Sequence, residues 1–356
     1  MAARVLETSA PALSAPALEV QRLRKRLVKR PRTVVLGLLA LLVAALLIRV
    51  LLGSYTVTFP DFLTILQGGT IEGARGARFI VMEDKLPRAV LGALVGLAFG
   101  CSGAIFQLLL RNPLASPDIL GISSGASLGA VIGIVFFGAT GFVLSGFAVA
   151  FALCLGLIIM ALARGSGSVG NRFVLMGIGI AELSGAIINY MLARIDISSA
   201  RSAVVWITGS LAPANWNRIE IVLVILLLVF PLVALIHINL HAVSVGEELA
   251  HGLGLNVPAT RWSSISLAVV LAAVGTAAAG PIAFVAFVSG PIARRLLGGR
   301  HSLLASALVG AIIVVLADFI TANYIPGGDL PVGVLTGALG APVLIWLLIQ
   351  SQKEGR

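Results

Sequence analysis

Few side chains in this sequence have a type and spacing that could support chemistry. His237 and His241 lie four residues apart, which would place two imidazole ligands on one face of a helix. No Glu completes a zinc-protease motif around them. Cys101 and Cys154 lie inside apolar runs, which favours a structural role over a disulfide or a metal site. We therefore predict no catalytic residue, no resident metal ion and no cofactor in this chain.

Two carboxylates lie inside long apolar runs, Glu182 in GIGIAELSGAII and Asp318 in VVLADFITA. An ionisable residue in a membrane segment can mark a path for protons or ions. It can equally be a polar contact to a neighbouring helix or face an aqueous cavity. Two carboxylates with no Lys or Arg in the same two helices do not favour a proton relay.

A third group of charges lies in the stretch SVGEELAHGLGLNV, residues 244–257. It contains apolar residues at helical spacing, two adjacent carboxylates and two closing glycines: Val245, Leu249 and Leu253; Glu247 and Glu248; Gly252 and Gly254. Apolar side chains at this spacing can seat a short helix in a groove of another protein. The carboxylates suit a helix N-terminus, and the glycines permit a sharp turn. The stretch is interpreted as a docking helix, with a surface loop as the alternative.

The elements that carry these residues are predicted to be membrane helices. Of the 356 residues, 58% are apolar and 11% are charged, which is typical of a polytopic membrane protein. The net charge of +10 does not indicate a nucleic-acid partner, because eight of the 25 Lys and Arg residues precede the first apolar run. This arrangement is typical of a cytoplasmic anchor.

We predict an all-α membrane protein with about ten helices and both ends in the cytoplasm. The apolar runs and one shorter segment broken by prolines are about 34–53, 88–109, 118–137, 141–163, 172–193, 219–238, 263–279, 282–296, 302–322 and 332–350. With this topology, 17 of the 25 Lys and Arg residues are cytoplasmic, which supports the orientation. The organisation is a mobile basic tail at 1–33, one transmembrane domain at 34–350 that includes a cytoplasmic loop at 239–262, and a cytoplasmic end at 351–356.

Small residues recur four apart in several predicted helices, which lets helix backbones approach closely in lipid. The four ladders are Gly92, Gly96 and Gly100; Gly121, Gly125, Gly129 and Gly133; Gly177, Ala181 and Gly185; and Gly333, Gly337 and Ala341. They predict a tightly packed bundle and say nothing of its function.

Six stretches, in order, resemble the FecCD/vitamin B12 permease family, the transmembrane subunits of type II ABC importers. They begin with KLPRAVLGALVGLAFGCSGAIFQLLLRNPLASPDILGISSGASLGA, and they continue with VWITGSLAPANW, VGEELAHGLGLNV, GPIAFVAFVSGPIARRLLGGRH, LVGAIIVVLADFI and DLPVGVLTGALGAPVLIWLL. The resemblance covers nearly everything from Lys85 to Leu348. The segments SGAIFQ and RNPLASPD are most similar to those of the ferric-enterobactin branch of this family.

The resemblance implies a permease in the bacterial cytoplasmic (inner) membrane that imports a ferric-siderophore complex. Its partners would be a second permease subunit, with a paralogue favoured over an identical copy, two ATPase subunits that bind ATP and Mg²⁺, and an external binding protein. The chain has no Gly-x-x-x-x-Gly-Lys-Ser/Thr phosphate loop, so the ATPase would be a separate chain. A haem or cobalamin importer and an ion-coupled secondary transporter are the alternatives.

The resemblance also assigns roles to residues that match the family's motifs. The ATPase-coupling segment comprises Val245, Gly246, Glu247, Glu248, Leu249, Ala250, Leu253 and Gly254. Lys85 and Arg88 match a position that docks the binding protein, and interfacial anchoring is the alternative. Asn112 and Leu114 match residues that narrow the pathway, and a helix cap is the alternative for Asn112. The Gly-rich loop ARGSGSVGNR falls at a further gate and receives no role.

Overall fold

The computed structural model describes residues 15–71, 74, 76–163, 169–325 and 330–354, and over these residues the chain is helical without a β-strand. The predicted all-α class is therefore confirmed. The helices are α1 (Ala15–Leu51), α2 (Phe59–Leu66), α3 (Ala77–Phe79), the π-helical turn η1 (Ile80–Lys85), α4 (Leu86–Leu109), α5 (Ile122–Phe137), α6 (Gly141–Leu162), α7 (Val169–Leu192), α8 (Ile197–Thr208), α9 (Trp216–Val245), α10 (Glu247–Gly252), α11 (Val257–Ala279), α12 (Val285–Leu296), α13 (Leu303–Tyr324) and α14 (Val332–Glu354).

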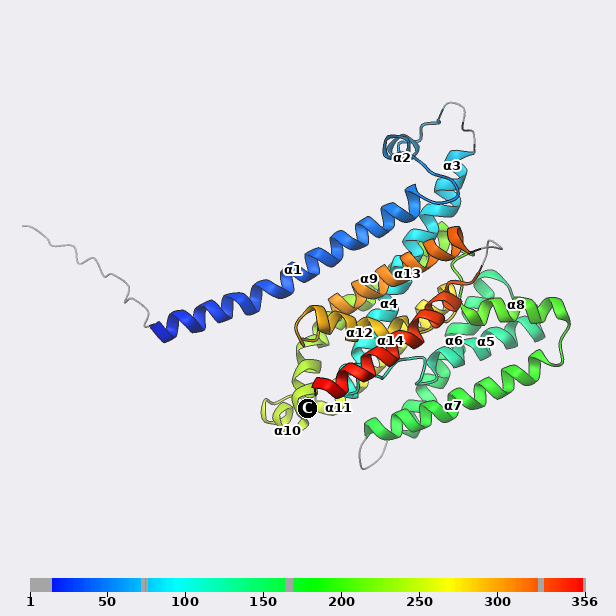
Figure 1. The fold of residues 1–356 in the computed structure, drawn as a ribbon. Coiled ribbons are helices and arrows are strands. Elements are labelled where there is room, and N and C mark those ends of the chain that lie inside the picture. The colour runs from blue at the N-terminus through cyan, green and yellow to red at the C-terminus, as the bar shows by residue number, and fades with distance from the viewer. Residues whose placement is uncertain (1–14, 72–73, 75, 164–168, 326–329, 355–356) are drawn as a thin grey trace, which may run out of the picture.

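Each predicted membrane helix has a counterpart among α1, α4 to α7, α9 and α11 to α14. Within the described residues, seven helices are long and apolar enough to cross a membrane. Helix α5 has 16 residues, about 24 Å, which is shorter than a hydrocarbon core of about 30 Å. The start of α1 and the end of α14 lie toward the same end of the bundle as α10, opposite α2 and α3 (Figure 1). The number of true spans and the orientation stay predictions.

The structure differs from the sequence prediction at short and terminal segments. Helix α1 begins at Ala15, inside the segment expected to be a tail, where Ala, Leu, Arg and Lys are strong helix formers. Residues 1–14 lie outside the described part, and the mobility of the tail stays a prediction. Helices α2 and α8 fall in expected loops. Both begin with a side-chain cap, from Thr58 in α2 and Asp196 in α8.

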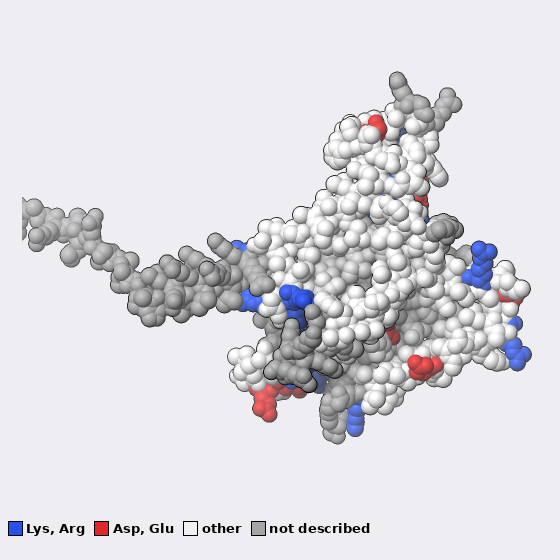
Figure 2. All heavy atoms as spheres, in the orientation of Figure 1, with Lys and Arg blue, Asp and Glu red and all other residues white. Residues whose placement is uncertain are grey.

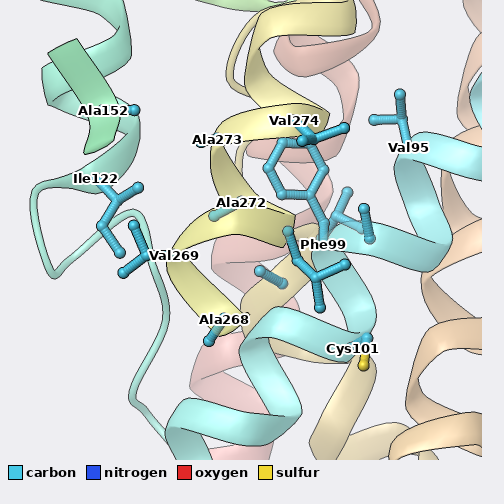
Figure 3. Close-up of a cluster of buried hydrophobic side chains, with 14 of the residues drawn as sticks. Val95, Phe99, Cys101, Ile122, Ala152, Ala268, Val269, Ala272, Ala273 and Val274 are labelled. Atoms are coloured by element: carbon cyan, nitrogen blue, oxygen red, sulfur yellow. The ribbon is translucent and has the colours of Figure 1, made fainter. Parts of the chain in front are cut away.

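Helix α4 lies at the centre of the bundle, packed against α13, α11, α12 and α9. Most of its residues from Pro87 to Leu108 are buried. On the side facing α11, the ring of Phe99 lies over Gly275, where an added Cβ would be 3.2 Å from the ring. Figure 3 shows Phe99 beside Ala272, Ala273 and Val274 of α11. The central helix is therefore surrounded by protein, although its sequence is as apolar as that of a lipid-facing helix.

Glycines bring the backbones of α4 and α13 into direct contact. A Cβ on Gly96 would lie 2.5 Å from both the Gly310 oxygen and the Ala311 Cα, and one on Gly100 would lie 2.3 Å from the Ser306 oxygen. A Cβ on Gly310 would lie 2.3 Å from the Gly96 oxygen. The close approach that the first small-residue ladder predicts is therefore confirmed.

The other small-residue ladders are confirmed in part. Gly129 lies against the backbone and Phe151 of α6, so the ladder of α5 does pack closely. Gly177 approaches the backbone of Leu120, but Gly185 in the same ladder has nothing within 4 Å. In α14, a Cβ on Gly333 would be 1.7 Å from the Thr208 oxygen. Small-residue spacing therefore marked a real contact in each helix, but not at every member.

We expect Gly96→Ala to lower the free energy of unfolding by about 1–3 kcal/mol, because the added methyl group overlaps backbone atoms of α13 that cannot rotate away. Thermal unfolding of the purified chain in detergent measures the loss. The matched control is Gly185→Ala, where the methyl group meets no atom within 4 Å. Equal melting temperatures for the two variants would contradict the packing argument.

Candidate functional site

The predicted docking segment forms a short helix of its own between two long ones. Helix α9 ends at Val245, α10 runs from Glu247 to Gly252, and α11 begins at Val257. Gly254 follows α10 with φ of 79°, a left-handed conformation that favours glycine. Asn256 then caps α11, because its Oδ1 accepts a hydrogen bond of 3.0 Å from the Ala259 amide. Helix, turn and cap follow one another within 13 residues, as the residue types predict.

Helix α10 has one buried anchor, and three exposed apolar residues lie at the end of α9, within α10 and just after it. Ala250 is fully buried against Val243 and Val257 of the flanking helices. Val245, Leu249 and Leu253 are 73%, 53% and 65% exposed. We call these three residues the apolar stripe. Since α10 lies at the tip of the bundle, the stripe is presented to a surface outside the chain (Figure 1).

The two adjacent carboxylates of α10 have different surroundings. Glu247 forms an ion pair with Arg261 of α11, which ties α10 to the start of that helix. Glu248 is exposed and takes part in none of the ion pairs that the described residues form. Acidic side chains gather at this tip, while the surface over the long helices in view is mostly uncharged (Figure 2). The sequence treated Glu247 and Glu248 alike, but only Glu248 is fully available to a partner.

The segment after α4 connects the central helix to the base of α10. Arg111 has φ of 49° and donates a hydrogen bond of 2.8 Å from Nη2 to the Val243 oxygen, near the end of α9. Asn112 is exposed, and its Oδ1 accepts a 2.9 Å hydrogen bond from the Leu114 amide. Leu114 is half-buried. Asn112 thus shapes the turn, and no described contact shows whether Asn112 and Leu114 also narrow a pathway.

At the opposite end of the bundle, Lys85 is buried rather than presented to a partner. Its Nζ donates hydrogen bonds to the carbonyl oxygens of Val50 at 3.2 Å, Leu52 at 2.8 Å and Tyr55. These oxygens lie at and just after the end of α1, where a cation complements the helix dipole. With 3% of its surface exposed, Lys85 does not fit the docking role that the resemblance assigns to it. It fastens α1 instead.

Arg88 belongs to a buried charge cluster that joins three helices. Asp318 of α13 accepts from Arg49 Nε at 2.6 Å and from Arg88 Nη2 at 2.9 Å. Arg88 also lies 3.6 Å from Asp84, which is about half-exposed. The side chains of Arg49 and Asp318 are each 2% exposed, and that of Arg88 is 13% exposed. We call Arg49, Arg88 and Asp318 the outer charge cluster.

Asp318 and Glu182, the two carboxylates in long apolar helices, have different surroundings. Asp318 is a polar contact between helices, which is one of the alternatives that the sequence left open. Its partners, Arg49 and Arg88, lie on other helices. The sequence around Asp318 contains no Lys or Arg and therefore could not reveal them. Glu182 is exposed on α7. No described residue forms an ion pair with it.

A cavity of about 460 Å³ lies where α5, α7, α8 and the start of α14 meet. Its polar lining is Asp118, Ser123, Ser124, Ser127, Asn189 and Thr208. Asp118 accepts a 2.5 Å hydrogen bond from Ser123 Oγ. Sequence reasoning missed this cavity, because its polar residues are divided among three helices and the turn before α5. The serines of GISSGAS, close after Asp118, were the available signal.

Comparison with known proteins agrees with this architecture. The model of the FecCD transport family matches residues 41–350. The Fe(3+)-citrate import system permease protein YfmE of Bacillus subtilis (strain 168) is 35% identical over 92% of this chain and 98% of its own length. The ferric enterobactin transport system permease protein FepG of Escherichia coli (strain K12) is 34% identical over 85% of this chain and 91% of its own.

Relatives also include a vitamin B12 importer. The vitamin B12 import system permease protein BtuC of Vibrio cholerae serotype O1 (strain ATCC 39315 / El Tor Inaba N16961) is 34% identical over 77% of this chain and 84% of its own. A solved structure of a metal-chelate type ABC transporter in an inward-facing conformation superposes with a TM-score of 0.79 at 26% identity. The match covers 90% of this chain and 99% of that one.

The outer charge cluster yields a prediction for stability. Asp318→Asn leaves Arg49 and Arg88 without their shared carboxylate, and breaking a buried ion pair costs about 3–5 kcal/mol. We expect a marked fall in melting temperature in detergent. Glu182→Gln is the control, since it neutralises an exposed carboxylate that no described residue pairs with. Similar melting temperatures for both variants would show that the cluster contributes little.

Proposed function

The chain belongs to the FecCD transport family of ABC-importer permeases, and we propose that it forms the translocation pathway for a ferric-siderophore complex. The observation that carries the proposal is α10, a helix anchored by one buried residue with an apolar stripe facing outward. In an importer, that stripe would contact a separate ATPase subunit, because this chain has no phosphate loop. The same geometry would have no task in a secondary transporter that acts alone.

The cargo assignment is supported by the names of the relatives. YfmE and FepG are named for iron(III) complexes, and BtuC is named for vitamin B12. A ferric chelate is therefore our first choice, with cobalamin or haem as the alternative. We place part of the pathway wall at the cavity lined by Asp118, Asn189 and Thr208. Its polar lining within an apolar bundle suits a hydrated cargo.

We propose that ATP binding on two partner subunits moves α10 and thereby switches the permease between outward-open and inward-open states. Movement of α10 would reach α9 and α11 through Ala250 and through the Glu247–Arg261 ion pair. It would reach α4 through the hydrogen bond from Arg111 to Val243. Asn112 and Leu114, the proposed gate, directly follow Arg111. A displacement passed on through Arg111 would therefore move the gate.

The remaining partners are a second permease subunit, with a paralogue favoured, and an external binding protein that delivers the cargo. Of the two basic residues assigned to docking, only Arg88 keeps some exposure, and its guanidinium is shared with Asp318. We therefore centre docking on Arg88 and leave Lys85 out. The bacterial cytoplasmic membrane is the location that this assembly requires.

Transport in proteoliposomes tests the proposal. We expect the chain, assembled with its second permease subunit, ATPases and loaded binding protein, to take up a radiolabelled ferric siderophore only when ATP is supplied. Leu249→Asp/Leu253→Asp should lower uptake and ATPase association at least about tenfold, because it places charge in the contact stripe. The control is Ile197→Asp, which places the same kind of charge at a 90% exposed apolar residue at the start of α8, outside the stripe.

The outcomes of that assay are distinct. Uptake of cobalamin or haem but not of a ferric siderophore would replace the cargo and keep the importer. Uptake that follows a proton gradient without any ATPase would overturn the importer itself. Normal ATPase association in the Leu249→Asp/Leu253→Asp variant would overturn the role of α10.

A charge swap separates the roles of the two carboxylates. Glu247→Arg alone sets two cations against each other and should release α10 from α11, with a loss of ATP-driven uptake. In the swap Glu247→Arg/Arg261→Glu the pair is restored, so we expect uptake to recover if Glu247 only positions α10. Failure of the swap to recover would mean that the Glu247 carboxylate contacts the ATPase directly. Glu248→Arg, which breaks no described ion pair, reports on direct contact alone.

A further inference from the structure

A second cavity lies at the end of the bundle that carries α10, and its lining is basic. It has a volume of about 310 Å³ between the ends of α4, α9 and α12 and the loop before α13. The lining residues are Gln107, Leu108, Arg111, Pro113, Ser244, Gly290, Pro291, Arg294 and His301. We call this cavity the basic pocket. It contains two arginines and a histidine without a carboxylate among its lining residues.

Arg111 and Arg294 use only some of their N–H donors in hydrogen bonds to described residues. Arg111 uses Nη2 on the Val243 oxygen, and Arg294 uses Nε on the Gly299 oxygen at 3.1 Å. Each guanidinium carries five N–H donors, so further donors remain for a ligand. Neither arginine takes part in an ion pair within the described chain. Two positive charges therefore share one cavity without a described counter-charge.

His301, which lines the same pocket, is also affected by the positive charges around it. Burial and then the positive charges of Arg294 and His241 lower the pKa of His301 below its ordinary value. The ring of His241 lies close to this loop, with Nε2 3.4 Å from the His301 oxygen. Burial disfavours a charge of either sign, but the positive charge of Arg294 disfavours only a further cation and would attract an anion.

We propose that the basic pocket binds the phosphate of an anionic phospholipid. Arginine suits phosphate because its planar fork can donate two parallel hydrogen bonds. Basic pockets between membrane helices near the cytoplasmic side are suited to anionic headgroups. The Ser244 hydroxyl donates its proton to the His241 oxygen, so it does not supply a donor to the anion. Recognition therefore rests on the arginines.

The walls of the basic pocket favour a lipid over a protein partner. Ile238, one turn before His241 on α9, is 76% exposed, and Leu304, three residues after His301, is 57% exposed. Neither residue lines the pocket, but both lie on helices that border it, and exposed apolar side chains there suit acyl chains that run from a bound headgroup into the bilayer. The apolar stripe is not part of the pocket lining.

Lipid titration of the permease complex tests the proposal. Nanodiscs of phosphatidylcholine receive increasing phosphatidylglycerol, and native mass spectrometry counts the lipid retained on the complex. We expect phosphatidylglycerol to be retained in preference to phosphatidylcholine, and Arg294→Gln to reduce its affinity about fivefold. Arg172→Gln is the matched control, since it removes the same charge from an exposed position at the same end of the bundle. Arg111→Gln is the second variant, with its folding checked by thermal unfolding.

Four results would overturn the proposal. Equal retention of the two lipids, or an equal loss in Arg172→Gln, would show that no specific site exists. Displacement of phosphatidylglycerol by inorganic phosphate at low concentration would assign the pocket to free phosphate. Loss of the lipid signal when the ATPase subunits are added, with a cross-link from the pocket to that subunit, would assign it to a protein partner.

Discussion

The close contact of α4 with α13 is the constraint on which the rest of the structure depends. Gly96, Gly100 and Gly310 remove the side chains that would separate the two helices, so backbone meets backbone. In lipid there is little hydrophobic gain from bringing apolar helices together, so close van der Waals contact has to supply the stabilisation. Once this pair is formed, α4 can be surrounded by α11, α12 and α9.

Polar contacts along α4 complete that arrangement. The side chains of Ser102, Gln107 and Arg111 donate to backbone oxygens of α11, α12 and α9, respectively. Ser102 and Gln107 lie in the last third of α4, and Arg111 lies just after its end, so these contacts join one end of the central helix to three neighbours. The base of α10 is therefore attached to the buried central helix, which is a suitable arrangement for passing on a mechanical displacement.

Features encoded by residues close together in the sequence were predicted, whereas contacts between residues far apart in the sequence were missed. A short helix with exposed apolar residues was predicted within 244–257, because its acidic start, apolar spacing and glycine turn are local, although Val245 belongs to α9 rather than to that helix. The burial of Lys85 was not predicted, because its acceptors lie 30 to 35 residues earlier and are backbone oxygens that no side-chain pattern reveals. The partners of Asp318 lie 230 and 269 residues away. A motif match placed Lys85 and Arg88 at the correct end of the bundle but could not show that both are used internally.

The outer charge cluster also has a consequence for the order in which the chain is made. Arg49 is 269 residues ahead of Asp318. At a synthesis rate of about 5–20 residues per second, the ribosome adds the carboxylate on the order of tens of seconds after the arginine. During that interval α1 carries a cation in its last turn without its eventual partner. A chain that stops before α13 lacks Asp318, so Arg49 stays without this carboxylate partner. The state of Arg49 therefore differs between an unfinished and a finished permease.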